Sequence, residues 1–444
     1  MKTKCTKILI AEWIPSLNKG ELAILIGTLK TFKRLGTVEV SIFSCNPAID
    51  TERYPKGMKL VDVGKNLHLG NSLIGRSKWA DLRVRIFPVI QHFFFALLYK
   101  IFGKNTLKFM RNPLWLEYCR SDAIIVCHDQ VDCVFGFILP YSPVYITLFA
   151  KALHKPVIIY ANGSPLYVGR LWKILASFVL NNVDLITVRD KMSFLYLQQF
   201  VRDKNRIHLT GDPAILLPPA NVERIAELMR REKLHTCQGL LVGATMSREV
   251  LLKAFPKEVN PSIRYQKALT AIAQMFDRLI EGFQATIIFV PHCIEQYDNR
   301  DDRVVAKEIY TIIKNKDKVK IIFEEYSPED LKGLIGKFDI FVTTRIHSAI
   351  GALSMNVPSC IIAKSSDSRA YGLIGELLKQ EEWVYNVECL DADSLFMRVR
   401  SLLSFSDKIR ESLPPIVESA REKAYLNADL LKILLDSRSN IHDD

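Results

Sequence analysis

The stretch TTRIHSAIGALS, residues 343–354, lies between two apolar runs and indicates how the chain folds. The run before it, 338–342 (FDIFV), and the run after it, 358–363 (PSCIIA), have the composition of buried parallel strands. The residues between them suit a helix, so the stretch predicts a strand–helix–strand unit of an open α/β sheet. Arg345 and His347 then fall at the carboxyl end of a strand, which is the edge where such sheets bind ligands.

The chemistry of these side chains suits a ligand at that edge. An Arg guanidinium presents a planar fork that matches phosphate or carboxylate, and a His can move a proton near neutral pH. A structural interpretation stays open, in which Arg345 pairs with a nearby Asp and His347 caps the helix. The position at a strand end favours the ligand-binding interpretation, and Ser348 is a further candidate for contact with substrate.

Length and charge restrict the class of protein. A chain of 444 residues is too long for one ordinary core, so two domains are expected. The 60 Lys and Arg against 48 Asp and Glu give a net charge of +12, which indicates anionic ligands or an anionic surface. No basic arm, finger spacing or RNA-binding signature indicates nucleic acid.

The cysteines and the first residues indicate the compartment. The nine Cys include no CxxC pair, so neither a zinc site nor a disulfide framework is predicted, and free thiols fit a reducing cytoplasm. The first residues are too polar for a signal peptide. We therefore expect a cytoplasmic protein.

The first predicted strand, residues 7–11, leads to a helix that begins near Asn18. Asn18 and Glu21 have the spacing of a capping box, and Gly20 lies between them. We expect the helix to begin here with its backbone amides available to an anion. A plain strand–turn–helix unit would produce the same pattern.

Two more predicted strands in the first half of the chain end in ionisable residues. The strand at 122–127 ends at His128 and Asp129, which makes His128 a candidate acid or base and Asp129 a candidate substrate contact. A loop His beside an Asp is also common as a purely structural arrangement. The strand at 183–188 is followed by Arg189, in the same kind of position as Arg345.

The residues after Arg189 leave two interpretations open. Arg189 and Ser193 are substrate-binding candidates, but Arg189 and Asp190 could equally form a helix-cap arrangement. In the second half, the strand at 286–290 ends at His292, a third candidate acid. Asp298, Asp301 and Asp302 follow it, and pairing with Arg300 and Arg303 is favoured there over a divalent metal ion.

These motifs, in their order and spacing, resemble the polysaccharide pyruvyl transferase family. Residues 345–348, with 352–353 and 357–358, are similar to the C-terminal signature of that family. Residues 18–25 are similar to its Asn-x-Gly-Asp/Glu-x-Ala-Ile-Leu stretch. The resemblance extends over residues 7–375, but Cys127-His128-Asp129 stands where family members usually carry a Gly-rich turn.

The resemblance implies an α/β fold of two Rossmann-like domains facing each other across a cleft, as in the glycosyltransferase-B architecture. We expect an N-terminal domain at 1–219, a C-terminal domain at 220–385, and closing helices and tail at 386–444. Neither GxGxxG nor a Walker loop follows a predicted strand, so no dinucleotide and no cofactor are expected. No metal is required by the chemistry.

The implied activity is transfer of the pyruvyl group of phosphoenolpyruvate to hydroxyls of a hexose, which forms a ketal. The acceptor would be a cell-surface polysaccharide or its lipid-linked precursor. The candidate acids are His347, His292 and His128. The substrate-binding candidates are Arg189, Arg345, Ser348, Asn18, Gly20, Glu21, Asp129 and Ser193.

Two other functions stay open. A glycosyltransferase with a nucleotide-sugar donor could use the same fold, with Arg345 on the diphosphate. A non-catalytic member of the family is also compatible, because of the altered turn at 127–129.

The segment at 86–103 departs from regular α/β alternation. It is apolar and rich in Phe, with polar interruptions and basic residues at both ends. It is predicted to be either a buried domain helix or an interfacial helix in peripheral contact with a membrane, at the inner face of the cell membrane.

Overall fold

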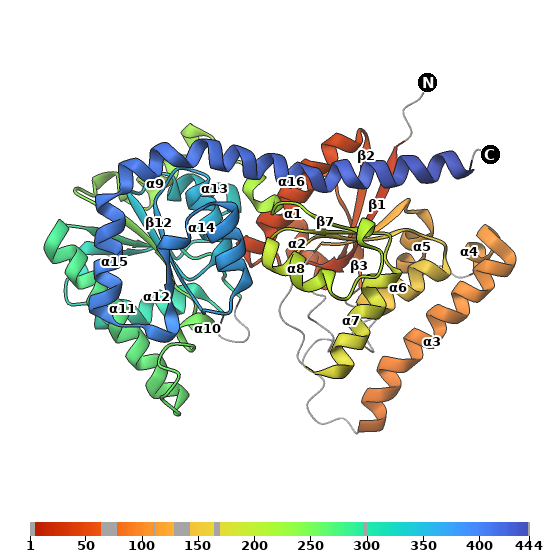
Figure 1. Cartoon of the computed structure of the whole chain (residues 1–444), viewed down its shortest axis with the longest axis horizontal. Helices are drawn as coiled ribbons and strands as arrows, with labels where there is room; N and C mark the ends of the chain where they lie inside the picture. The colour runs from red at the N-terminus through yellow and green to blue at the C-terminus, as the bar shows by residue number, and fades with distance from the viewer. Residues whose placement is uncertain are drawn as a thin grey trace. The chain divides into compact units, whose positions relative to one another are not determined.

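The computed structural model describes residues 5–63, 78–109, 112–127, 143–163, 169–295 and 300–442. These residues form two sheets in which all neighbouring strands are parallel. The first sheet has the order β3-β2-β1-β4-β5-β6-β7, and the second has the order β10-β9-β8-β11-β12-β13. Each order reverses at its first strand, as in doubly wound Rossmann folds, so the predicted pair of Rossmann-like domains is confirmed (Figure 1).

The first sheet and its helices follow an alternating order along the chain. The strands are β1 Thr6–Trp13, β2 Val38–Ser44, β3 Lys59–Asp62, β4 Ala123–Val126, β5 Val157–Asn162, β6 Leu185–Val188 and β7 Ile207–Leu209. The helices are α1 Lys19–Phe32, α2 Pro47–Arg53, α3 Lys78–Phe102, α4 Thr106–Phe109, α5 Pro113–Arg120, α6 Pro143–Ala152, α7 Arg170–Asn182 and α8 Lys191–Gln198.

The second sheet is built in the same way. The strands are β8 Leu241–Thr245, β9 Thr286–Phe289, β10 Val319–Ile321, β11 Ile340–Thr343, β12 Ser359–Ala363 and β13 Val384–Asn386. The helices are α9 Val222–Arg231, α10 Arg248–Leu251, α11 Pro261–Phe283, α12 Asp302–Ile312, α13 Pro328–Ile335, α14 Ile346–Leu353, α15 Ala392–Ser404 and α16 Ser406–His442. A short 3₁₀ helix, η6 Pro213–Leu216, precedes them.

Contacts within the chain divide it into two compact units. The first comprises Met1–Ser16, Thr28–Gly211 and Lys423–Asp444, and the second comprises Leu17–Gly27 and Asp212–Glu422. This division differs from the boundaries expected from the sequence, because α1 begins in the second unit and the end of α16 belongs to the first. The beginning of α1 packs in the second unit through a small apolar cluster. Its members are Ala23, Ile24, Ala214 and Leu217.

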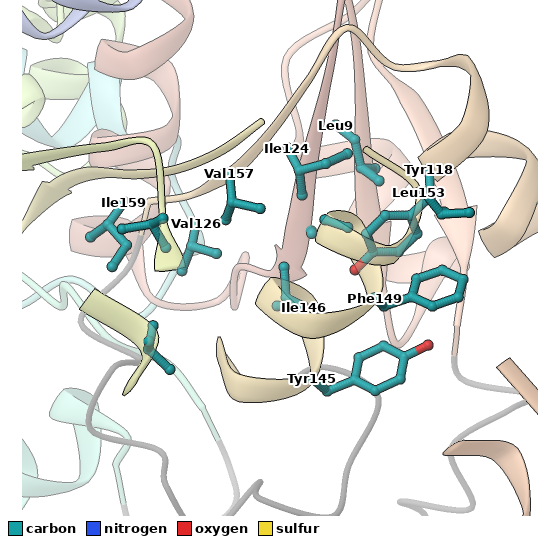
Figure 2. Close-up of a cluster of buried hydrophobic side chains, with 14 of the residues drawn as sticks. Leu9, Tyr118, Ile124, Val126, Tyr145, Ile146, Phe149, Leu153, Val157 and Ile159 are labelled. Carbon is teal, nitrogen blue, oxygen red and sulfur yellow. The ribbon is translucent and has the colours of Figure 1, made fainter. Parts of the chain in front are cut away.

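A large cluster of the core of the first unit lies on one face of its sheet. Inward-facing strand residues alternate with residues that face the opposite side, as expected for strands buried on both faces. Figure 2 shows Leu9, Ile124 and Val157 directed toward the helical side chains Tyr145 and Phe149. Helices α3, α5, α6, α7 and α8 all contribute side chains to this cluster.

His92 of α3 is buried in this core. Its ring contacts those of Trp115 and Phe149, and its Nδ1 pairs with the hydroxyl of Tyr145. Burial lowers the pKa of His92 to about 4. The imidazole is therefore neutral in the folded protein at neutral pH.

This burial predicts a loss of stability in acid. The unfolded chain protonates His92 near pH 6.5, whereas the folded protein resists protonation until about pH 4. The contribution of His92 to the free energy of unfolding is fully present above pH 6.5. It falls by about 1.4 kcal/mol per pH unit as the pH drops from 6.5 to about 4. Urea unfolding at several pH values gives the slope of the free energy of unfolding against pH. This slope should be smaller by about that amount in His92→Phe than in the wild type. Equal slopes would mean that His92 takes up a proton as readily in the folded protein as in the unfolded chain.

Candidate active site

The loop after β11 is fixed by hydrogen bonds before it enters α14. Thr343 Oγ1 accepts from the amide of Arg345 at 2.9 Å and pairs with Ser348 Oγ at 2.8 Å. Ser348 Oγ also donates to the carbonyl of Arg345 at 2.7 Å. Ser348 is fully buried, so it holds the loop rather than facing a substrate as the sequence suggested.

Arg345 forms an ion pair with Asp302 at the start of α12. Its Nε and Nη2 donate to Asp302 Oδ1 at 3.2 and 2.7 Å, and the other carboxylate oxygen accepts from the amides of His292 and Cys293. Burial disfavours the charge on Arg345, but Asp302 outweighs this effect and raises the pKa of the guanidinium. The structural alternative for Arg345, pairing with a nearby Asp, is therefore present. Its Nη1 has no hydrogen-bond partner among the described residues.

The position of Asp302 differs from what the acidic residues after β9 led us to expect, which was pairing with Arg300 and Arg303. Asp301 pairs with the neighbouring Arg303, as expected. Asp302 is buried and pairs with Arg345, which is distant in sequence, rather than with Arg300 or Arg303 at the surface. Within the described ranges, no group of three His, Cys, Asp or Glu side chains is arranged to hold a metal ion.

His292 lies beside this ion pair and is almost completely buried. Burial lowers the pKa of His292 to about 3, and the charges of Arg345, His347 and Lys19 act in the same direction. The ring is therefore neutral at physiological pH. Its Nδ1 has no hydrogen-bond partner among the described residues.

His347, in the first turn of α14, lies between a carboxylate and a glycine. Its Nε2 is 3.6 Å from Oδ2 of the buried Asp212, which also caps η6 by accepting from the amide of Ala214. A Cβ added to Gly20 would lie 3.0 Å from both Cβ and Nδ1 of His347. Glycine at position 20 therefore lets the imidazole lie directly against the start of α1.

The start of α1 is tied to the same region. Asn18 Oδ1 accepts from the amides of Gly20 and Glu21 at 3.2 and 3.4 Å, and the amide of Lys19 donates to the carbonyl of His292 at 2.8 Å. The predicted helix start at Asn18 is confirmed. In this structure Asn18 and His292 accept from these amides, and binding of an anion here stays a prediction.

Each basic side chain of the site lies near a carboxylate. Lys19 Nζ is 2.6 Å from Glu325, Arg345 is 2.7 Å from Asp302, and His347 approaches Asp212. Lys19, Asp212 and Glu325 were not predicted as site residues from the sequence. Only Asp212 could have been found from a sequence pattern, because it belongs to the Gly-Asp-Pro-Ala turn at residues 211–214.

The remaining candidate site residues belong to the first half of the chain. Arg189 follows β6 directly and is fully buried, and its amide donates to the carbonyl of Asn162. Asp190 accepts from the amide of Ser193 at 2.8 Å and caps α8, which is the structural alternative for this pair. His128 and Asp129 lie outside the described residues.

The fold is similar to that of several two-domain α/β proteins of solved structure. A putative UDP-N-acetylglucosamine 2-epimerase from Listeria monocytogenes is similar, with a TM-score of 0.58 and 12% identity, covering 99% of this chain and 98% of that one. The UDP-GlcNAc 2-epimerase from Neisseria meningitidis has a TM-score of 0.56 and 12% identity, covering 98% and 100%. Arabidopsis thaliana UGT89C1 has a TM-score of 0.54 and 13% identity, with the same coverage. These similarities confirm the glycosyltransferase-B-like fold.

Sequence comparison assigns the family. The chain belongs to the polysaccharide pyruvyl transferase family, whose model matches residues 18–366. It is also 23% identical over 423 residues to the amylovoran biosynthesis protein AmsJ of Erwinia amylovora, covering 94% of this chain and 96% of that protein. The resemblance read from the motifs is confirmed, and the protein is a transferase that acts on polysaccharide.

Proposed function

We propose that the protein transfers the pyruvyl group of phosphoenolpyruvate to two hydroxyls of a hexose, forming a cyclic ketal. The acceptor is a cell-surface polysaccharide or its lipid-linked precursor. Family membership and the relative that is named for amylovoran biosynthesis support this activity. The observation that carries the proposal is His347 held between the Asp212 carboxylate and Gly20, with Arg345 two residues before it.

His347 is the general acid of the proposed reaction. Its Nε2 is buried beside Asp212, so a proton on that nitrogen faces the carboxylate. Nδ1 lies against Gly20, and the proposed reaction requires this nitrogen to carry the proton that is transferred. His292 is neutral because of its burial, and this makes it a poor proton donor.

Arg345 binds the anionic end of the donor. Asp302 occupies its Nε and Nη2, so Nη1 is the nitrogen that donates to a phosphate or carboxylate oxygen. The amides in the first turn of α14 lie next to it and add the positive end of a helix dipole. Asp302 fixes the guanidinium in this orientation. From the sequence we expected the whole planar fork of Arg345 to be available to the ligand, whereas two of its nitrogens bind Asp302.

The steps balance without another reactant. His347 protonates the methylene carbon of phosphoenolpyruvate, and the neighbouring carbon becomes cationic. An acceptor hydroxyl attacks that carbon and loses its proton. The bond from that carbon to the phosphate oxygen breaks and releases inorganic phosphate, and a second hydroxyl closes the ketal with loss of its proton.

Calorimetric titration distinguishes this proposal from a nucleotide-sugar glycosyltransferase. The wild type should bind phosphoenolpyruvate, and Arg345→Lys should bind it more weakly, because Lys keeps the charge but has no Nη1 beside a nitrogen pair held by Asp302. Tight binding of UDP, with no phosphoenolpyruvate signal, would contradict the proposal. Binding of phosphoenolpyruvate without turnover on any acceptor would indicate a non-catalytic member of the family.

The contact between Gly20 and His347 gives a separate prediction. In Gly20→Ala the new methyl group meets the His347 ring at 3.0 Å, so the ring must move. We expect turnover to fall about tenfold or more, since small misplacements of a catalytic group can cost up to about 10²-fold. Stability should change little, because Ala favours a helix by about 0.5–1 kcal/mol over Gly.

Gly351→Ala is the matched control for Gly20→Ala. Gly351 lies in α14, and a Cβ added there meets nothing within 4 Å. This variant should keep the wild-type rate of phosphate release. If both glycine variants have the same rate, the Gly20–His347 contact does not matter for catalysis.

A further inference from the structure

Helix α3 is apolar on two opposite faces. Its inner face contributes His92, Phe95 and Ala96 to the core of the first unit. Its outer face exposes Ile90, Phe94, Leu97 and Ile101, with exposed fractions between 55% and 64%. The spacings of four, three and four residues place these side chains on one stripe of the helix. The segment is therefore both a domain helix and a helix with an uncovered apolar face.

Helix α7 carries a second apolar stripe on the same side of the sheet. Leu171, Ile174 and Phe178 are exposed and are spaced three and four residues apart. Helix α6 contacts both α3 and α7, and its Leu148 is also exposed (Figure 1). Exposed apolar stripes on neighbouring helices are typical of an interaction site.

A groove of about 500 Å³ runs beside α7 and combines apolar and basic residues. Ile174, Phe178 and Phe200 contribute apolar surface to it. Arg170 and Arg202 line the same groove, so apolar and cationic groups are adjacent there.

The charge around these helices is strongly biased. Residues 78–182, from the start of α3 to the end of α7, contain twelve Lys and Arg but only five Asp and Glu. One of the five, Glu117, is buried and pairs with Lys59. The exposed cations next to the apolar stripes form no ion pair with a described residue. They are Lys100, Lys104, Lys108, Arg170 and Lys173.

We propose that the outer faces of α3, α6 and α7 dock the first unit on an anionic lipid bilayer. The apolar stripes enter the boundary between headgroups and acyl chains, and the Lys and Arg side chains contact lipid phosphates. The contact is peripheral. No helix in the described part of the chain is long and apolar enough to cross a membrane.

Charge favours a bilayer over a second copy of this chain. In a symmetric dimer through this surface, the unpaired lysines of one copy would face those of the other, and like charges repel. An anionic bilayer instead neutralises them and covers both apolar stripes at once. This inference does not depend on which donor the enzyme uses.

Flotation with vesicles tests the proposal on the full chain. The wild type should float with vesicles of mixed phosphatidylglycerol and phosphatidylcholine at low salt, and less with phosphatidylcholine alone. The double variant Phe94→Ser/Leu97→Ser should bind at least about tenfold more weakly, since two buried apolar side chains are lost. Each of Lys100→Gln, Lys104→Gln and Lys108→Gln should weaken binding about fivefold, and salt should remove that difference.

Val259→Ser is the matched control, because Val259 is an exposed apolar residue of the second unit. It should bind vesicles like the wild type, and circular dichroism should show that all variants are folded. Equal binding by the wild type and Phe94→Ser/Leu97→Ser would overturn the proposal. So would a wild type that stays unbound at low salt, or a dimer in gel filtration that this double variant dissociates without any vesicle binding.

Discussion

Replacing His347 with Gln is expected to lower turnover of phosphoenolpyruvate by about 10²–10⁴-fold, the usual contribution of a positioned general acid. Glutamine is similar in size and polarity, so it can fill the space beside Asp212 and Gly20 without carrying a transferable proton. Binding of phosphoenolpyruvate should be almost unchanged, because the proposed anion contacts are Arg345 and the amides of α14. His347→Gln should therefore release phosphate more slowly while it keeps the calorimetric affinity for phosphoenolpyruvate.

The neighbouring residues provide the comparison for this variant. Asp212→Asn keeps an acceptor for the amide of Ala214, so η6 stays capped, but it removes the negative charge beside Nε2. It should lower the rate without unfolding the protein. A near-normal rate in His347→Gln would make His347 structural, and His128 would become the better candidate because His292 is held neutral by burial.

Removing the Asp302 carboxylate is expected to have the largest effect on stability. Its side chain is 2% exposed and that of Arg345 is 19% exposed, so Asp302→Ala leaves a buried guanidinium without its partner. Loss of one member of a buried ion pair costs about 3–5 kcal/mol. The amides of His292 and Cys293 lose their acceptor as well, which adds to the loss. Urea unfolding of the two proteins measures the difference.

An exposed ion pair in the same unit is the control. Glu418 and Arg421 lie 3.1 Å apart with both side chains exposed, so Glu418→Ala should cost no more than about 1 kcal/mol. Replacing both members of the buried pair, as in Arg345→Met/Asp302→Leu, should restore part of the stability while abolishing donor binding. If Asp302→Ala loses no more than Glu418→Ala, the pair does not stabilise the fold.

The sequence was sufficient for the strands and their carboxyl ends. The apolar run 338–342 was predicted as a strand, and β11 spans Ile340–Thr343 with Arg345 and His347 after it. Parallel strands buried on both faces produce such continuous apolar runs, and this signal is local. Asn18 was recognised as a helix start for the same reason, because capping depends on residues that are close in sequence.

Partners that are distant in sequence could not be predicted. Asp302 was expected to pair with adjacent arginines, but the fold brings Arg345 to it. The packing of residues 17–27 within the second unit was also unexpected. It depends on close contacts such as that of Gly27, where an added Cβ would lie 1.9 Å from the carbonyl oxygen of Pro213. No periodicity or spacing in the sequence indicates such an approach.

For helix α3, the sequence could not predict which face packs inside. The sequence left a buried helix and an interfacial helix as alternatives for residues 86–103, and each describes one face. A helix that is apolar all round gives no directional signal, so the pattern could not show which side chains would pack inside. Contacts of His92 and Phe95 with other aromatic rings decide the orientation.

The most direct test of the central claim is turnover with phosphoenolpyruvate and a saccharide acceptor. Cell-surface polysaccharide freed of its ketals by mild acid serves as acceptor, and phosphate release is followed together with the ketal methyl signal in proton NMR. The proposed reaction predicts that phosphate and ketal form in equal amounts, and that His347→Gln forms both about 10²–10⁴-fold more slowly. Consumption of a nucleotide-sugar by the same protein, with phosphoenolpyruvate left unchanged, would contradict pyruvyl transfer.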